Sequence, residues 1–103
     1  MPVETCAVTN YPIEISGWDK DEDFFVERTN LEWTETRKVV RLHHSIPRGS
    51  LVFVRLIGES KECLSHPLAY ETVDVKFQEQ DHAYETLLTL MHPRTRSASE
   101  FAN

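Results

Sequence analysis

Short runs in which apolar and polar residues alternate occur along most of the chain, and they predict β-strands. Alternation places successive side chains on opposite faces of a strand, so that one face can be buried while the other meets water. The fourth run is apolar on both faces, which predicts a central strand covered on both sides. The expected strands are, in order, residues 13–17, 24–33, 38–43, 51–57 and 69–77.

Residues typical of turns separate these runs. Residues 19–23 form a charged cluster that is unsuited to burial and predicts an exposed hairpin turn. Closely spaced carboxylates suit Ca²⁺, but this segment lacks the glycine and the distal glutamate of a calcium loop, so a solvated turn is favoured. Residues 45–50 contain Pro47 and Gly49 and predict a second turn. Within residues 24–33 the apolar positions are irregular, which indicates a β-bulge.

A different spacing near the C-terminus predicts one helix. Asp81 is a suitable N-cap, and Pro93 is expected to end the helix. We expect this helix to cover an open end of the sheet and residues 94–103 to form a flexible polar tail. The apolar stripe at positions i, i+3, i+4 and i+7 consists of Tyr84, Leu87, Leu88 and Met91.

These elements predict a mostly β fold: a small five- to six-stranded antiparallel, partly closed β-barrel with one C-terminal α-helix. A sheet of about five strands with little cover must curl to hide its apolar face. The chain has 103 residues, which suits one domain with one core, expected to span residues 1–93. A hydrophobic fraction of 40% and a charged fraction of 27% are typical of a globular protein.

Charge and cysteine content narrow the range of partners and cellular locations that the chain could have. The formal net charge of −6 disfavours nucleic acid as a partner, because an acidic surface repels phosphate backbones. No apolar run approaches the roughly 18 residues of a membrane span, and no secretory signal pattern opens the chain. Cys6 and Cys63 are too few for a disulfide framework. We therefore expect a cytoplasmic protein with reduced thiols and no membrane partner.

The order of features over residues 13–91 resembles the bacterial PilZ domain family. The resemblance is carried by the strand at 13–17, the aromatic strand at 24–29, the segment 42–49, the strand at 51–56 and the strand that ends at Phe77. The predicted terminal helix also falls where that family has one. The resemblance implies a bacterial β-barrel with a regulatory role in cyclic di-GMP signalling.

The two motifs by which PilZ receptors bind cyclic di-GMP are degraded in this chain. The first is RxxxR before the first strand, where arginine forks grip phosphates, but no arginine precedes Arg28 here. The second is [D/N]xSxxG, which falls on residues 32–37, with Arg37 in place of the glycine. The resemblance therefore implies a non-canonical PilZ-like domain that lacks the ordinary nucleotide site and acts by protein contacts.

Five residues are candidates for binding a ligand or partner: Arg28, Trp33, Arg37, Arg41 and Arg48. Arg37 and Arg41 share strand parity and are expected to form a basic stripe for phosphate or an acidic partner. The alternative is a solvated face in which arginines pair with acids at positions 32, 35 and 59. Trp18 and Trp33 either pack in the core or, if exposed, mark a hot spot for a protein partner. An exposed strand edge would also allow a homodimer.

Nothing in the sequence indicates an enzyme, a cofactor or a metal site. Nucleophilic catalysis needs a serine or cysteine beside a base and an oxyanion hole, and no GxSxG or similar motif is present. Cys63 and His66, with His43 and His44, have a spacing that fits zinc. However, adjacent histidines on a strand point to opposite faces, so no metal is expected.

Three hypotheses follow. The first is a PilZ-like regulatory and protein-interaction domain without the standard cyclic di-GMP motifs. The second is a divergent cyclic di-GMP receptor that reads phosphates through Arg37, Arg41 and Arg48. The third is an unrelated small barrel that binds single-stranded nucleic acid, which would show salt-sensitive binding.

Overall fold

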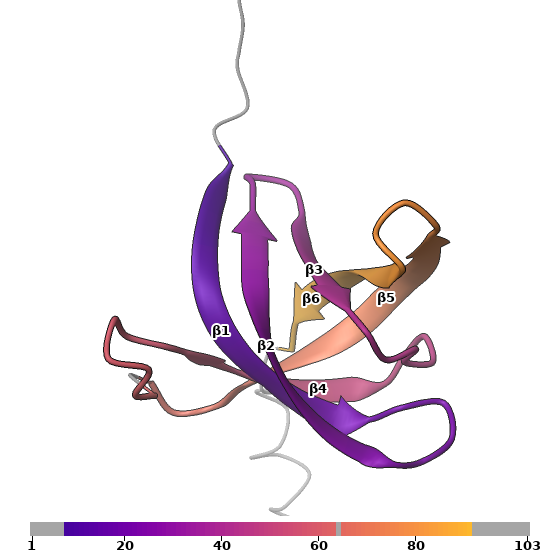
Figure 1. Ribbon diagram of the computed structural model, residues 1–103, viewed down its shortest axis with the longest axis horizontal. Coiled ribbons are helices and arrows are strands. Elements are labelled where there is room, and N and C mark those ends of the chain that lie inside the picture. The colour runs from indigo at the N-terminus through magenta and orange to yellow at the C-terminus, as the bar shows by residue number, and fades with distance from the viewer. Residues whose placement is uncertain (1–7, 64, 92–103) are drawn as a thin grey trace, which may run out of the picture.

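Six antiparallel strands make up the fold in the computed structural model, which describes residues 8–63 and 65–91 (Figure 1). The tail expected at 94–103 lies outside these residues. None of the described residues forms a helix long and apolar enough to span a bilayer. The strands are β1 (Thr9–Trp18), β2 (Phe24–Trp33), β3 (Lys38–Leu42), β4 (Leu51–Leu56), β5 (Leu68–Gln78) and β6 (Ala83–Leu90).

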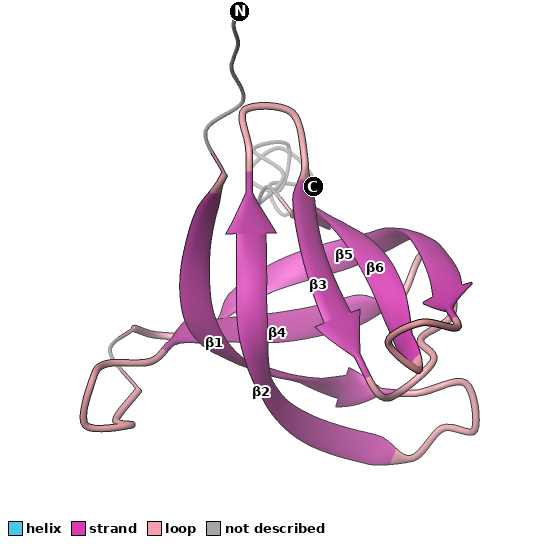
Figure 2. Ribbon diagram, turned by 45° about the horizontal axis from the view of Figure 1, so that its top comes forward, coloured by secondary structure: helices cyan, strands magenta, loops and turns pink. Residues whose placement is uncertain are grey.

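The strands form a closed barrel in the order β1-β2-β3-β6-β5-β4 (Figure 2). Four pairs of consecutive strands form hairpins: β1–β2, β2–β3, β4–β5 and β5–β6. β3 and β4 do not pair with each other, and the barrel is closed by the pairing of β3 with β6 and of β1 with β4. The mostly β prediction and the barrel are confirmed, with complete rather than partial closure. Every described strand pairs with a neighbour on each side, although residues 24–30 of β2 lie outside the register shared with β3. The homodimer stays a prediction.

The predicted C-terminal helix is wrong, because its residues form β6. β6 lies between β3 and β5, and its backbone pairs with both neighbours. Its side chains alternate: Thr86 and Leu88 point into the barrel and are buried, whereas Thr89 is exposed. Adjacent leucines and the aromatic Tyr84 suit either structure, while threonine favours a strand. The non-local pairing thus outweighs a helical spacing of apolar residues.

Two further expectations are corrected by the burial of side chains and the strand register. β4 is not covered on both sides, because Val52 and Val54 are buried inside the barrel whereas Leu51 is exposed on the outside. The pairing of β1 with β2 runs without interruption, so the bulge expected in β2 is absent. A bulge occurs instead in β5, between Thr72 and Asp74.

Hydrophobic side chains from all six strands, and Ile46 from the loop between β3 and β4, fill the barrel. The buried cluster contains Ile13, Ile15, Phe25, Leu31, Val40, Leu42, Ile46, Val52, Val54, Tyr70 and Leu88. β1 and β4 approach closely at Gly17, where an added Cβ would lie 3.1 Å from the side chain of Val52 and 3.2 Å from the carbonyl oxygen of Leu51. Glycine at this position therefore permits the closure between β1 and β4.

Candidate protein-binding face

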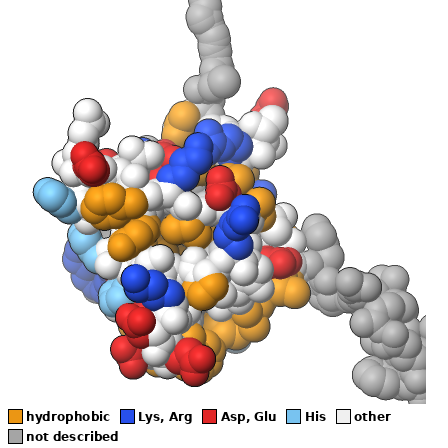
Figure 3. All heavy atoms as spheres, turned by 90° about the vertical axis from the view of Figure 1, so that its right-hand side faces the viewer, with side chains coloured by type: hydrophobic (Ala, Val, Ile, Leu, Met, Phe, Trp, Pro, Cys, Tyr) orange, Lys and Arg blue, Asp and Glu red, His pale blue; other side chains and the backbone are white. Residues whose placement is uncertain are grey.

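The five residues expected from the sequence to bind a ligand are spread over several elements. Arg28 lies on β2, Arg41 on β3, and Arg37 and Arg48 in the segments that precede β3 and β4. On the face shown in Figure 3, Lys and Arg side chains lie in several separate places among hydrophobic and acidic ones.

Arg41 lies among three carboxylates. Its guanidinium hydrogen-bonds Glu32, and its nitrogens lie 3.6 Å from carboxylate oxygens of both Asp81 and Glu85. The hydrogen bond to Glu32 raises the pKa of Arg41 above its usual value; partial burial opposes this shift, and the negative charge of the carboxylates adds to it. The positive charge of Arg41 thus faces acidic side chains of the same chain.

The remaining arginines differ in their surroundings. The Nε atom of Arg28 lies 3.2 Å from Oε1 of Glu14 on β1, and the Nη1 atom of Arg48 lies 4.0 Å from Oδ1 of Asp74. In the turn between β2 and β3, the backbone N–H of Arg37 donates to the hydroxyl of Thr34 at 3.0 Å. Since these arginines lie on different elements and two of them face carboxylates, a continuous basic stripe is not assembled from them.

Trp33, the fifth candidate, ends β2 at the rim of the barrel. Its indole ring meets Tyr11 edge to face, with ring centroids 5.9 Å apart, and the ammonium of Lys38 lies 4.5 Å from the ring centroid. A cation at this distance is attracted by the ring quadrupole. Trp33 is 38% exposed, so it is neither buried in the core nor fully presented to solvent.

An apolar surface lies on the outside of β1, β2 and β4, and of its residues only Trp18 was considered from the sequence as a contact for a partner. We call this surface the aromatic face and define it as Trp18, Phe24, Val26 and Phe53. Trp18 pairs with Phe24 across β1 and β2, and their rings meet edge to face at 5.1 Å. Trp18, Phe24 and Val26 are each more than half exposed. The strand positions of Phe24 and Val26 were predicted from the sequence, whereas Trp18 lies one residue beyond the strand expected at 13–17. Which face of β2 would point outward was not predicted.

A shallow hollow lies within the aromatic face. Ser16 on β1 pairs with Val26 on one side and with Phe53 on the other, so a small side chain stands between two large ones. The resulting pocket has a volume of about 430 Å³ and is lined by Glu14, Ser16, Phe24, Val26, Phe53, Arg55 and Pro67. A protruding apolar side chain of a partner fits such a hollow.

Charged groups border the aromatic face on two sides. On one side Glu14 pairs in register with Arg28 on β2 and with Arg55 on β4. On the other side is the turn 19–23, which joins β1 to β2 as the sequence predicted and holds four acidic residues and one lysine. An apolar centre with a charged border is the usual composition of a protein-binding surface.

The acidic turn is organised by its own hydrogen bonds. Asp19 Oδ1 accepts hydrogen bonds from the backbone N–H groups of Asp21 at 2.9 Å and Asp23 at 3.0 Å. Oxygens of these three carboxylates lie within 4.8 Å of one another. This is the geometry of an aspartate-stabilised turn, which accounts for their closeness without a bound cation.

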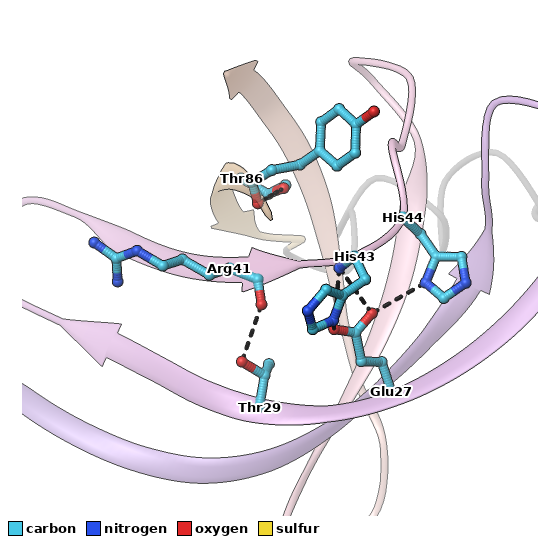
Figure 4. A network of polar contacts seen from close by, with 7 residues as sticks. Glu27, Thr29, Arg41, His43, His44 and Thr86 are labelled. Carbon is cyan, nitrogen blue, oxygen red and sulfur yellow. Dashed lines mark hydrogen bonds and ion pairs between the residues drawn. The ribbon is translucent and has the colours of Figure 1, made fainter. Parts of the chain in front are cut away.

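A second polar cluster continues the sheet where β2 and β3 separate (Figure 4). Backbone pairing between these strands covers only residues 31–33 and 38–40. Beyond it, the hydroxyl of Thr29 donates to the carbonyl of Arg41 at 3.0 Å, and the carboxylate of Glu27 accepts from the backbone N–H of His43. Side chains of β2 therefore satisfy backbone groups that a longer strand pair would satisfy.

Both histidines contact the same carboxylate. The Nδ1 atoms of His43 and His44 lie 2.8 Å and 3.0 Å from the two oxygens of Glu27 (Figure 4). The expectation that they point to opposite faces is wrong, because β3 ends at Leu42 and they follow it in a bend. The ring of His44 also stacks on the ring of Phe25, with the ring centroids 4.7 Å apart. This cluster holds the end of β3 against β2.

Among the described residues, the geometry thus offers an exposed apolar face with charged borders, whereas the candidate arginines do not form a continuous stripe. Comparisons of the chain with models of protein families, with curated proteins and with solved structures found no match.

Proposed function

We propose that this chain is a non-canonical PilZ-like regulatory domain that works as a protein-interaction module, not as an enzyme, and binds its partner through the aromatic face. The observation that carries the proposal is the exposure of Trp18, Phe24 and Val26 as neighbours on adjacent strands. Contiguous exposed apolar side chains mark interaction sites, and tryptophan is enriched where binding energy concentrates.

The surroundings of the aromatic face indicate the chemistry of the partner. The hollow at Ser16 suits an apolar side chain, because Phe24, Val26 and Phe53 line it, with Glu14 and Arg55 among its other lining residues. The acidic turn beside it suits basic residues on the partner, since complementary charges speed and orient association. We therefore propose a partner that presents an apolar anchor next to lysines or arginines.

The PilZ-like part of the proposal rests on the resemblance over residues 13–91. A closed barrel of six antiparallel strands is compatible with it, whereas β6 stands where the resemblance implied a helix. The setting of the arginines favours protein contacts over the divergent nucleotide receptor. Arg41 contacts three carboxylates, and a nucleotide phosphate would have to displace them and be accommodated beside their charge.

Site-specific photo-crosslinking in the native cells tests the proposal. A benzophenone amino acid is placed at Phe24 or, as a control, at Val73, which is also exposed on a strand but lies on β5. We expect a discrete cross-linked protein from position 24 and none from position 73. The same partner from both positions, or no product from either, would contradict the proposal, and a cross-link to a second copy alone would make this face a dimer interface.

Affinity measurements with the captured partner, once purified, complete the test. Trp18→Ser removes an aromatic ring, and Ser16→Arg fills the hollow without removing any apolar side chain. Each is expected to weaken binding by roughly 2 kcal/mol or more, as hot-spot substitutions do. Val73→Ser, which changes an exposed apolar residue on β5, serves as the matched control. Unfolding midpoints in urea show that the variants remain folded.

A further inference from the structure

A second pocket opens at one end of the barrel, away from the aromatic face. It is bounded by the beginnings of β1 and β5 and the ends of β2, β4 and β6, and its volume is about 330 Å³. That volume is at the lower end of the roughly 300–1,000 Å³ typical of small-ligand sites. The lining residues are Tyr11, Leu31, Trp33, Val54, Leu56, Ser65, Leu68, Tyr70 and Leu90.

The pocket has a buried floor and an accessible apolar rim. Leu31, Val54 and Tyr70 form the floor and are each no more than 3% exposed. The rim consists of Tyr11, Trp33, Leu56 and Leu68, which are between 38% and 50% exposed. Large apolar side chains that stay accessible around a concave floor are suited to enclosing an apolar molecule.

Tyr70, which lines the pocket, carries a hydroxyl that has no hydrogen-bond partner among the described residues. Its side chain is 2% exposed, and no hydrogen bond joins its hydroxyl to any other of the residues at 8–63 and 65–91. Buried hydroxyls are nearly always hydrogen-bonded, because an unsatisfied one costs about 1–3 kcal/mol. Burial raises the pKa of Tyr70, so its hydroxyl keeps its proton at neutral pH and remains a donor.

The other lining residues define the rest of the ligand. Ser65 Oγ already accepts the backbone N–H of Leu56 at 3.0 Å. None of the lining residues is charged, so a charged ligand group would be buried without a counterion. The rings of Tyr11 and Trp33, inclined at 75° to each other, offer surfaces against which a flat aromatic molecule packs.

We propose that this pocket binds a small, uncharged, planar aromatic compound whose carbonyl oxygen accepts a hydrogen bond from Tyr70. The site lies at the barrel end, whereas the aromatic face lies on the outer surface of β1, β2 and β4. The proposal is therefore independent of the protein-binding function and of the PilZ resemblance. It assigns a binding role to Trp33, whose position the sequence could not decide between core and surface.

Two probes of matched shape test the proposal on the full chain. Acetophenone carries the required carbonyl, and α-methylstyrene has the same shape with a CH₂ group in place of the oxygen. Binding is followed by the NMR signal of the Trp33 indole N–H, while Trp18 on the outer face serves as an internal control. Saturable shifts of the Trp33 signal, with Trp18 unchanged, are the expected result.

Tyr70→Phe isolates the hydrogen bond, because it removes the hydroxyl and leaves the ring in the floor. The acetophenone dissociation constant, divided by that of α-methylstyrene, is expected to rise about two- to tenfold in the variant. Leu68→Trp, which fills the exposed rim, should abolish binding of both probes. An unchanged ratio, a shift at Trp18 instead of Trp33, or binding that survives Leu68→Trp would each overturn the proposal, as would no saturable shift with either probe.

Discussion

The hydroxyl of Thr72 on β5 donates to the carbonyl oxygen of Pro47 across 2.6 Å, and it also accepts the backbone N–H of Ser50 at 2.9 Å. Thr72 is only 1% exposed, so both bonds are shielded from water. They hold the loop between β3 and β4 against β5. Gly49, with a φ of 81°, allows the loop to turn there, and its N–H donates to the Thr72 carbonyl at 2.7 Å.

Thr72→Val is expected to lower the free energy of unfolding by about 1–3 kcal/mol, because it removes both bonds of the buried hydroxyl. The Pro47 carbonyl and the Ser50 N–H then keep only their long bond to each other, at 3.3 Å. Urea denaturation measures the loss. Thr89→Val on β6 is the matched control, since that side chain is exposed and the same change there removes no buried bond. Equal stability of the two variants would show that the Thr72 contacts contribute nothing.

Gly17→Ala is expected to destabilise the barrel by roughly 1–3 kcal/mol through overpacking. The added methyl group would meet the side chain of Val52 at 3.1 Å and the backbone oxygen of Leu51 at 3.2 Å, and a backbone atom gives way poorly. At Gly58 the nearest atoms, at 2.6 Å, belong to the flexible carboxylate of Glu62, so Gly58→Ala should cost less. Thermal unfolding of the pair checks the order, which the opposite ranking would refute.

Tyr70→Phe should change how stability depends on alkaline pH. Burial raises the pKa of Tyr70 above its ordinary value of 10.0, so the folded state holds the proton after the unfolded state has lost it. This contribution is fully present below pH 10.0 and is lost as the pH rises through the folded-state pKa. As the pH rises above 10.0, the free energy of unfolding should therefore fall less in Tyr70→Phe than in the natural chain. Parallel curves from pH 8 to 11 would contradict this account.

Cyclic di-GMP is expected not to bind with micromolar affinity. No arginine precedes Arg28, and Arg41 is held by Glu32, Asp81 and Glu85. Isothermal titration calorimetry should record only heats of dilution. Micromolar binding that disappears in Arg37→Ala would instead favour the divergent receptor, and salt-sensitive binding of single-stranded nucleic acid would favour the third hypothesis.

Much of the fold follows from local sequence pattern, and the main error came from non-local pairing. β2 occupies the same residues as predicted, and β3 and β4 each end one residue early. Their alternation reflects burial of one face, which a local window records. β6 was missed because Leu87 and Leu88 fit a helical stripe, and only the pairing with β3 and β5 decides for a strand.

The candidate site was less accessible from the sequence. The exposure of Trp18 and Phe24 depends on which face of β1 and β2 turns inward, and that depends on the closure of the barrel. The ion pairing of Arg41 was foreseen in part, since Glu32 was named as an acid that would pair with the arginines. Asp81 joins it only because β6 lies beside β3, which no local pattern contains.

Closure of the barrel by β3 with β6 and by β1 with β4 also has a kinetic consequence. The hairpins β1–β2 and β5–β6 need short loops and can form early, whereas β3 must find a strand that lies about 40 residues away along the chain. Closing so long a loop costs conformational entropy before the contacts between β3 and β6 compensate for it. Folding is therefore expected in the millisecond-to-second range of β-rich domains. Until β6 docks, the half-formed sheet presents β3 as an unpaired edge, and this is the stage at which the chain is most prone to aggregate.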